Sequence, residues 1–207
     1  MTAIDDKRLS NRARRDRKQE ILENATRLFA DYGFQGTSFA LVAQAVGLTE
    51  QGVLHYFPSK VHLLQAVLEY HEQKLYDRYT PLIDTEVGTY PLLFDLLEGV
   101  YAENEKIPGL IQLFTVLVSE SIREDHPSHA YFVDRYRRGR ELYTRQLRNI
   151  AGAATRPDVD YDQLAYLIMA MMDGLQIQWL LDPGKVDLVG AFRVFTKMVL
   201  TYLEGES

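Results

Sequence analysis

The feature that most constrains the fold is the 3.6-residue spacing of apolar side chains along almost the whole chain. Residues 21–32 show it first, with an apolar face opposite charged side chains. Similar segments follow at about 39–46, 50–57, 59–79, 91–105, 108–124, 128–151, 160–181 and 187–204. No segment alternates with the two-residue period of a strand. The sequence therefore predicts an all-α fold of about nine helices.

Composition excludes several classes of protein. The 207 residues are 46% hydrophobic and 25% charged, which is typical of a chain that folds in water, and cysteine is absent. A disulfide framework, a thiol nucleophile and a cysteine zinc site are therefore excluded. No uncharged apolar run approaches the roughly 20 residues that span a bilayer, and the first ten residues lack the apolar core of a signal peptide. We expect a cytoplasmic protein without a membrane-spanning helix.

Charge is distributed unevenly along the chain. Residues 1–62 hold 9 Lys and Arg against 7 Asp and Glu, whereas residues 63–207 hold 14 against 22. The basic residues gather between Arg8 and Lys18, so residues 1–17 are expected to form a basic flexible arm. Two interpretations stay open: a solvated tail, or an arm whose Arg12, Arg14 or Arg15 enters a DNA minor groove.

Residues 38–60 carry the most specific pattern. Ser38 and Thr49 each precede a short apolar-periodic segment, where a hydroxyl can cap a helix, and Gly47 lies between the two segments. Two short helices joined by a glycine-containing turn form a helix-turn-helix, whose second helix presents side chains to the major groove. Val53 and Phe57 are expected to face inward. The outward set is Thr49, Glu50, Gln51, Gly52, His55 and Tyr56.

The run from Ile21 to Leu64 resembles the TetR-type (TetR/AcrR-like) family of one-component transcriptional regulators. The matching residues occur in the family's order: Ala25, Phe29, Gly33, Phe34, Thr37, Val42, Ala43, Ala45, Gly47, Leu48, Thr49, Tyr56, Phe57, Ser59, Lys60 and Leu63. Glu50-Gln51 and Leu54-His55 depart from the usual pattern, so the operator sequence is not inferred. The resemblance implies a DNA-binding domain at 18–64 and a helical effector-binding and dimerisation domain at 65–207.

The resemblance also implies which residues contact double-stranded DNA. Phosphate contacts carry over to Thr37, Ser38, Tyr56 and Lys60, and base-edge contacts to Gln51, Gly52 and His55, with Thr49 on the same surface. Glu50 can accept a hydrogen bond from a cytosine amine but also repels phosphate.

The last two segments are apolar on more than one face, which favours burial against a second subunit. The residues concerned are Leu164, Leu167, Ile168, Met171, Met172, Leu175, Ile177, Trp179, Leu180 and Leu181, then Phe192, Val194, Phe195, Met198, Val199, Leu200, Tyr202 and Leu203. We expect a homodimer through these two helices, which would let two recognition helices read a palindromic operator.

A small, mainly apolar effector is the expected ligand of the larger domain. The candidate lining residues are Phe94, Tyr101, Phe114, Leu117, Tyr136, Tyr143, Met169, Met172, Gln176 and Trp179. Each of them can instead simply fill the core. Gln176 is the most informative, because an amide within an apolar helix needs polar partners.

Catalytic and metal-binding patterns are weak. The sequence holds no glycine-rich phosphate loop and no Gly-x-Ser-x-Gly elbow, so neither an enzyme nor a cofactor is predicted. Residues 124–129, Glu-Asp-His-Pro-Ser-His, have metal-ligand types, but the proline spoils helical ligand spacing and no metal is expected. We expect a homodimeric repressor that leaves its operator when an effector binds. The alternative is a helical ligand-binding or scaffold protein whose helix-turn-helix does not read DNA.

Overall fold

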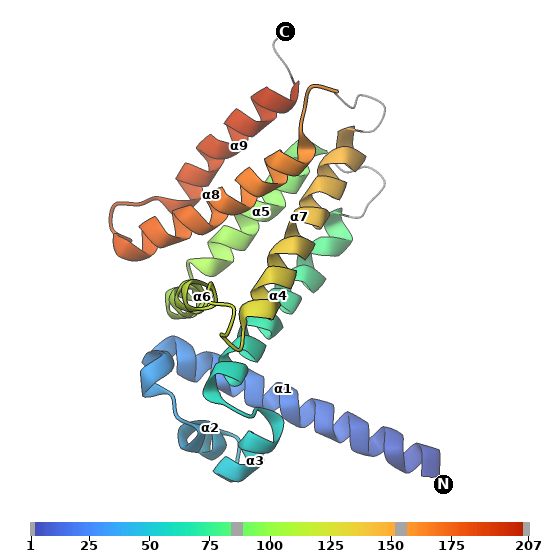
Figure 1. Cartoon of the computed structure of the whole chain (residues 1–207), viewed down its shortest axis with the longest axis vertical. Helices are drawn as coiled ribbons and strands as arrows, with labels where there is room; N and C mark the ends of the chain where they lie inside the picture. Colours follow the sequence, from blue (N-terminus) through green and yellow to red (C-terminus); the bar gives the residue numbers. More distant parts are fainter. Residues whose placement is uncertain (1–2, 84–88, 152–156, 205–207) are drawn as a thin grey trace. The chain divides into compact units, whose positions relative to one another are not determined.

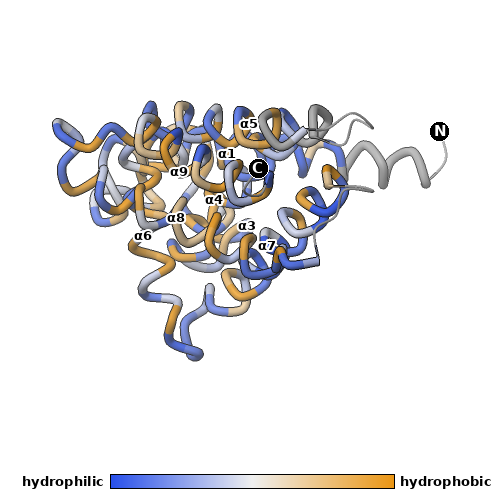
Figure 2. Tube along the Cα trace, turned by 90° about the horizontal axis from the view of Figure 1, so that it is seen from above, coloured by the Kyte–Doolittle hydropathy of each residue, from blue (hydrophilic) through white to orange (hydrophobic). Residues whose placement is uncertain are grey.

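A computed structural model describes residues 3–83, 89–151 and 157–204. Within these ranges the chain forms nine helices and no strand, as the apolar periodicity predicts (Figure 1). The helices are α1 (Ala3–Gly36), α2 (Phe39–Ala45), α3 (Glu50–Tyr56), α4 (Lys60–Ile83), α5 (Tyr90–Asn104), α6 (Pro108–Glu120), α7 (His129–Ala151), α8 (Tyr161–Leu181) and α9 (Leu188–Glu204). Along the chain trace, apolar and polar residues alternate within each helix, the pattern of amphipathic elements (Figure 2).

The chain divides into two compact units, Met1–Gln73 and Lys74–Ser207. This division falls later than the boundary expected after residue 64, because the first unit includes the first turns of α4. Helix α4 is continuous from Lys60 to Ile83, so it contributes residues to both units.

Helix α1 is broken near its end by Gly33. This residue has φ 67° and ψ −176°, a combination that is essentially restricted to glycine. A Cβ built on Gly33 would meet nothing within 4 Å, so the backbone conformation rather than a lack of space requires glycine here. The regular helical path therefore ends where the sequence predicted, although one more short turn runs on to Gly36.

Two side chains stabilise the backbone around this break. The buried Thr37 hydroxyl lies 2.9 Å from the Gly33 carbonyl oxygen and 3.0 Å from that of Leu28, so it can donate to either. The Lys60 ammonium donates to the Phe34 carbonyl oxygen at 2.8 Å and lies 4.3 Å from the centroid of the Phe34 ring. The bonds to Gly33 and Phe34 satisfy carbonyl groups that the end of a helix leaves without a helical partner.

The core of the first unit collects the apolar faces of its helices. Ile21, Ala25 and Phe29 of α1 are fully buried, as predicted, and so are Val42 of α2 and Val53 of α3. Tyr32, expected on the same face of α1, is instead 60% exposed.

The first residues of α1 also differ from expectation. Instead of a flexible arm, the chain is helical from Ala3, and residues 1–2 lie outside the described ranges. No glycine or proline interrupts the chain before Gly33, and Arg, Lys, Gln and Ala have high helix propensity. Arg17 and Glu20 pair at 2.8 Å and Gln19 donates to Glu23 at 3.0 Å, which further supports the helix.

The core of the second unit is built mainly from α5, α7, α8 and α9. Leu93, Tyr101, Leu147, Ile168 and Phe192 are almost completely buried in it. Helices α8 and α9 pack against each other (Figure 1). Helix α8 is the one described helix that is long and apolar enough by composition to cross a membrane, but Leu164, Ile168, Leu175 and Trp179 of this helix are buried in the core of the second unit.

Candidate functional site

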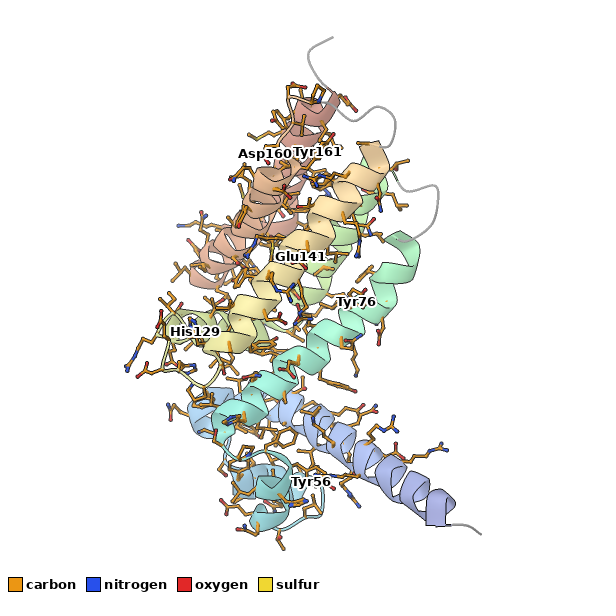
Figure 3. All side chains as sticks on the ribbon, turned by 45° about the vertical axis from the view of Figure 1, so that its right-hand side comes forward. Tyr56, Tyr76, His129, Glu141, Asp160 and Tyr161 are labelled. Atoms are coloured by element: carbon orange, nitrogen blue, oxygen red, sulfur yellow. The ribbon has the colours of Figure 1, made fainter. Side chains whose placement is uncertain are left out.

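Helix α3 presents the predicted set of polar side chains to solvent. Thr49, Glu50, Gln51 and His55 are exposed, and Gly52 and Tyr56 are half-buried. Val53 and Phe57 are buried on the opposite side, which confirms the predicted orientation of the helix. Figure 3 labels Tyr56, which lies at the end of α3. A short helix with one buried face and one exposed polar face can approach base edges in a major groove.

The hydroxyl groups of Ser38 and Thr49 cap the two helices of this motif. Ser38 Oγ accepts from the Leu41 N–H at 3.1 Å, and Thr49 Oγ1 accepts from the Gly52 N–H at 3.1 Å. Each hydroxyl keeps its own hydrogen for a further bond, and both residues are exposed. They are therefore compatible with donation to a phosphate oxygen.

Thr37 is not compatible with the phosphate contact expected for it. Its side chain is fully buried, and its single hydroxyl hydrogen faces the Leu28 and Gly33 carbonyl oxygens. Thr37 is therefore a structural residue of the α1–α2 connection, and we omit it from the candidate interface. Lys60 also has a structural role, through its bond to Phe34, although an ammonium group has further hydrogens to donate.

A basic hollow lies beside Tyr56. Its volume is about 440 Å³, and Arg14, Arg15, Lys18 and Tyr56 line it. The Lys18 ammonium also lies 5.7 Å from the centroid of the Phe57 ring. Three cations and a phenol without a lining carboxylate form a suitable environment for phosphate oxygens. The sequence groups Lys18, Arg14 and Arg15 in one basic run but indicates a phosphate contact beside Tyr56 for none of them, because the helical course of these residues was not predicted.

The residues predicted to line an effector site occupy different surroundings. Tyr101, Phe94 and Trp179 belong to the main core of the second unit, and Tyr143 and Met172 pack against it. Gln176 and Leu117 are also buried, and Met169 is half-buried. Phe114 packs instead against Phe132, with ring centroids 5.9 Å apart.

Asp173 on α8 is a polar centre that the sequence did not indicate. The Tyr136 hydroxyl, from α7, donates to Asp173 Oδ2 at 2.6 Å. Nearby, the Tyr143 hydroxyl lies 3.7 Å from the Met172 sulfur. The Tyr101 hydroxyl is fully buried and has no hydrogen-bond partner among the described residues. We call Tyr101, Tyr136, Tyr143 and Asp173 the tyrosine–aspartate cluster.

Burial dominates the acid–base behaviour of this cluster. It raises the pKa of the Asp173 carboxyl, although the Tyr136 hydrogen bond and the charge of Arg135 oppose the increase. Burial also raises the pKa of Tyr101 above its usual value, assisted by Tyr143 and by the charge of Asp173. The pKa of Tyr136 is raised by burial and by Asp173. A cation beside Asp173 would therefore relieve an electrostatic cost that the protein itself only partly offsets.

The histidine-containing turn at 124–129 is stabilised by its own hydrogen bonds. His126 Nδ1 lies 2.9 Å from the Ser121 hydroxyl and accepts from the Ser128 N–H at 3.2 Å. His129 Nδ1 lies 2.8 Å from the Ser121 carbonyl oxygen. Across the described residues, no group of three or more histidine or acidic side chains is arranged to hold a metal ion. This turn also ends α6 at Glu120, four residues before the expected end.

Two family models match the chain. Residues 21–67 match bacterial regulatory proteins of the tetR family, and residues 94–204, more than half of the chain, match the C-terminal domain of BetI-type transcriptional repressors. The HTH-type transcriptional repressor KstR2 of Mycolicibacterium smegmatis is 26% identical over 89% of this chain and 89% of its own length. The nucleoid occlusion factor SlmA of Mannheimia succiniciproducens is 29% identical over 52% of this chain, and the match spans 50% of SlmA.

Solved structures share the fold. A transcriptional regulator from Saccharomonospora viridis in complex with choline has a TM-score of 0.68 and 21% identity, covering 88% of this chain and 94% of its own. The regulator FadR from Bacillus subtilis in complex with stearoyl-CoA has a TM-score of 0.73 and 13% identity, covering 88% and 97%.

Removing the charge of Asp173 is expected to change how stability depends on pH. Because the folded pKa of Asp173 is raised, the folded state binds the proton more tightly than the unfolded state, whose aspartate pKa is about 3.9. The contribution of Asp173 to stability therefore falls as pH rises from about 3.9 to its folded pKa. Asp173→Asn should remove this loss and be more stable than the wild type at neutral pH. A tenfold difference in proton affinity between the two states corresponds to about 1.4 kcal/mol.

Urea unfolding at several pH values measures this difference. Asp95→Asn, which removes an exposed carboxylate from α5, controls for the loss of one negative charge. A difference between wild type and Asp173→Asn that stays constant from acid to neutral pH would contradict the burial of a titrating carboxyl.

Proposed function

Because the chain belongs to the TetR family of bacterial regulatory proteins and has a BetI-type C-terminal domain, we propose that it is a homodimeric repressor that binds a palindromic operator and releases it when a small effector binds. The observation that carries the proposal is the exposed polar face of α3 beside the basic hollow. Such a protein acts in the cytoplasm, where it meets the chromosome, and we assign it no catalytic role.

The DNA interface that we propose has two parts, one that reads bases and one that binds phosphates. Gln51, Gly52 and His55 on α3 meet base edges, which carry sequence information. Ser38, Thr49, Tyr56 and the hollow formed with Arg14, Arg15 and Lys18 meet phosphates, which position the protein without reading sequence. This interface favours the operator-binding function over a scaffold that does not read DNA. We therefore propose that the arginines of the hollow contact backbone phosphates, and this replaces the alternative in which a basic arm enters the minor groove.

Effector binding is expected to act on DNA through α4. The helix begins at Lys60, whose ammonium bonds the end of α1, and its later turns belong to the second unit. An effector can shift this helix only if it binds the two states of the protein with different affinity, and such coupling typically amounts to about 1–3 kcal/mol.

The dimer that we propose uses the outer face of α8 and α9. Leu167, Leu181, Val194 and Met198 are each between 60% and 80% exposed, and Ile177 and Tyr202 are also exposed. Residues 194, 198 and 202 follow four-residue spacing, so they share one face of α9. An apolar surface of this kind on a monomer is typical of an interface.

The effector that we propose is a small organic cation that also carries a hydroxyl group. Asp173 supplies a half-buried negative charge that accepts a hydrogen bond from the Tyr136 hydroxyl, and Tyr101 and Tyr143 are neighbouring aromatic residues of a kind suited to a cation. The unpartnered hydroxyl of Tyr101 needs a polar partner, which a hydroxylated ligand provides. The regulator from Saccharomonospora viridis that binds choline supports this class of ligand. The sequence alone predicted a mainly apolar effector, and the proposal adds a positive charge to it.

We expect base reading and phosphate binding to separate by mutation. The wild type should select a palindrome from random DNA duplexes. Gln51→Ala should change the preference at one base pair of each half-site, by about 1–3 kcal/mol. Arg15→Gln should weaken operator and scrambled duplex alike and reduce the slope of log affinity against log salt by about 1.

Fluorescence anisotropy at several salt concentrations checks these effects. Arg123→Gln removes an exposed arginine of the second unit and should leave both affinities unchanged. Selection of no sequence by the wild type would favour the alternative of a helical ligand-binding protein. Equal behaviour of Gln51→Ala and Arg15→Gln would show that the assigned roles are wrong.

The double variant Leu181→Glu, Met198→Glu is expected to be monomeric, because it places buried charges in the proposed dimer interface. Sedimentation velocity at micromolar concentration should give a dimer for the wild type and a monomer for the variant, with unchanged helical content. Ile122→Glu, at a residue that is 76% exposed on the turn after α6, is the matched control and should stay dimeric. A monomeric wild type would contradict the interface.

Choline should lower the affinity of the wild type for its selected operator. Its uncharged isostere, with a quaternary carbon in place of the nitrogen, should not. Asp173→Asn should raise the choline concentration needed by at least about tenfold, since it removes the charge that faces the cation. Asp95→Asn should respond like the wild type. Equal effects of choline and the isostere would show that charge does not select the effector.

A further inference from the structure

A groove between α7 and α8 has a charge opposite to that of the molecule. Its volume is about 610 Å³, and it is lined by Arg137, Arg140, Glu141, Thr144, Arg145, Arg148, Asn149, Asp162 and Tyr166. Figure 3 labels Glu141 on α7 and Tyr161, which begins α8, and so marks the two helices. Four arginines against two carboxylates leave a net charge of +2, in a chain whose net charge is −6.

The two carboxylates of the groove are already neutralised. Arg137 donates to both oxygens of Glu141 at 2.8 Å and 2.9 Å, and Arg148 donates to Asp162 at 2.9 Å. The positive charge that remains therefore belongs to Arg140 and Arg145. Arg145 has no hydrogen-bond or ion-pair partner among the described residues.

Arg140 is held in place without being neutralised. Its guanidinium carbon lies 4.7 Å from the centroid of the Tyr166 ring, so the ring restricts the side chain but leaves its N–H groups for other acceptors. Thr144 and Asn149 add a hydroxyl and an amide as further donors. The groove thus offers several donors around an uncompensated positive charge.

We propose that this groove binds a small molecule that carries two adjacent phosphate groups. Planar guanidinium groups bind phosphate oxygens through paired, charge-assisted hydrogen bonds. The volume lies within the range of small-ligand sites, about 300–1,000 Å³. The site is separate from the tyrosine–aspartate cluster, whose carboxylate repels anions. The protein would then take a cation and an anion at two places on the same pair of helices.

Inorganic pyrophosphate is the probe for this proposal. Titration calorimetry of the full chain at physiological ionic strength, with a scrambled DNA duplex occupying the basic hollow beside Tyr56, should show saturable binding of one pyrophosphate per chain. The double variant Arg140→Gln, Arg145→Gln should weaken this binding by at least about tenfold, because charge-assisted hydrogen bonds are lost. Arg145 is exposed and Arg140 is half-buried, and the melting temperature of the variant verifies that it folds.

Arg138→Gln is the matched control. Arg138 lies on the same helix and pairs with Asp134 at 2.8 Å, but it does not line the groove. It should leave pyrophosphate binding unchanged. An equal loss in Arg138→Gln, or binding that sulfate abolishes at the same ionic strength, would show only non-specific attraction and would overturn the proposal. So would the absence of saturable binding.

A competition experiment distinguishes binding of a small phosphate compound from binding of DNA phosphates. A scrambled DNA duplex should not displace pyrophosphate, and the double variant should bind the selected operator as the wild type does. Displacement by the duplex would assign the groove to DNA and contradict the small ligand. Because operator binding is measured in the same variant, failure of the groove is distinguishable from failure of the repressor function.

Discussion

The backbone break at Gly33 and the contacts that hold it determine the position of the whole helix-turn-helix. A helix that ends leaves carbonyl groups without partners, and burying them unpaired would cost about 1–3 kcal/mol each. Thr37 donates to the Gly33 carbonyl oxygen, and Lys60, much later in the chain, donates to that of Phe34. Thr37 immediately precedes the cap of α2, and Lys60 begins α4. The same few atoms therefore fix where α2 and α4 start relative to α1.

A second constraint comes from the charge of Asp173. Most of α8 is apolar, and a carboxylate within it is costly unless donors or cations compensate. Tyr136 supplies one hydrogen bond, and Arg135 supplies favourable charge. The raised pKa of Asp173 shows that this compensation is incomplete. The uncompensated charge of Asp173 lowers the stability of the fold. It also suits the tyrosine–aspartate cluster to a ligand, because a bound cation would supply the missing favourable interaction.

Much of the architecture follows from apolar spacing and a few punctuating residues. The starts of α2, α3 and α6 were predictable from Ser38, Thr49 and Pro108, since caps and proline act locally. The site was less predictable. Thr37 looks like a surface hydroxyl in the sequence, and only its burial assigns it to the break. The sequence pointed to Gln176 on α8 but not to Asp173, because a lone carboxylate in a helix is usually solvated. The hydrogen-bond partner of Asp173, Tyr136, is also distant in sequence.

The helical course of residues 12–18 has a consequence for the thermodynamics of association. A disordered basic tail would lose conformational entropy when it settles on a polyanion, and that loss reduces its net contribution to affinity. Here the backbone is already ordered, so only side-chain rotamers remain to be restricted. The cations are also presented at the fixed rise of a helix, about 1.5 Å per residue. The entropic cost of ordering the chain therefore offsets little of the favourable electrostatic energy. Association of this basic segment with a polyanion resembles docking of a rigid surface.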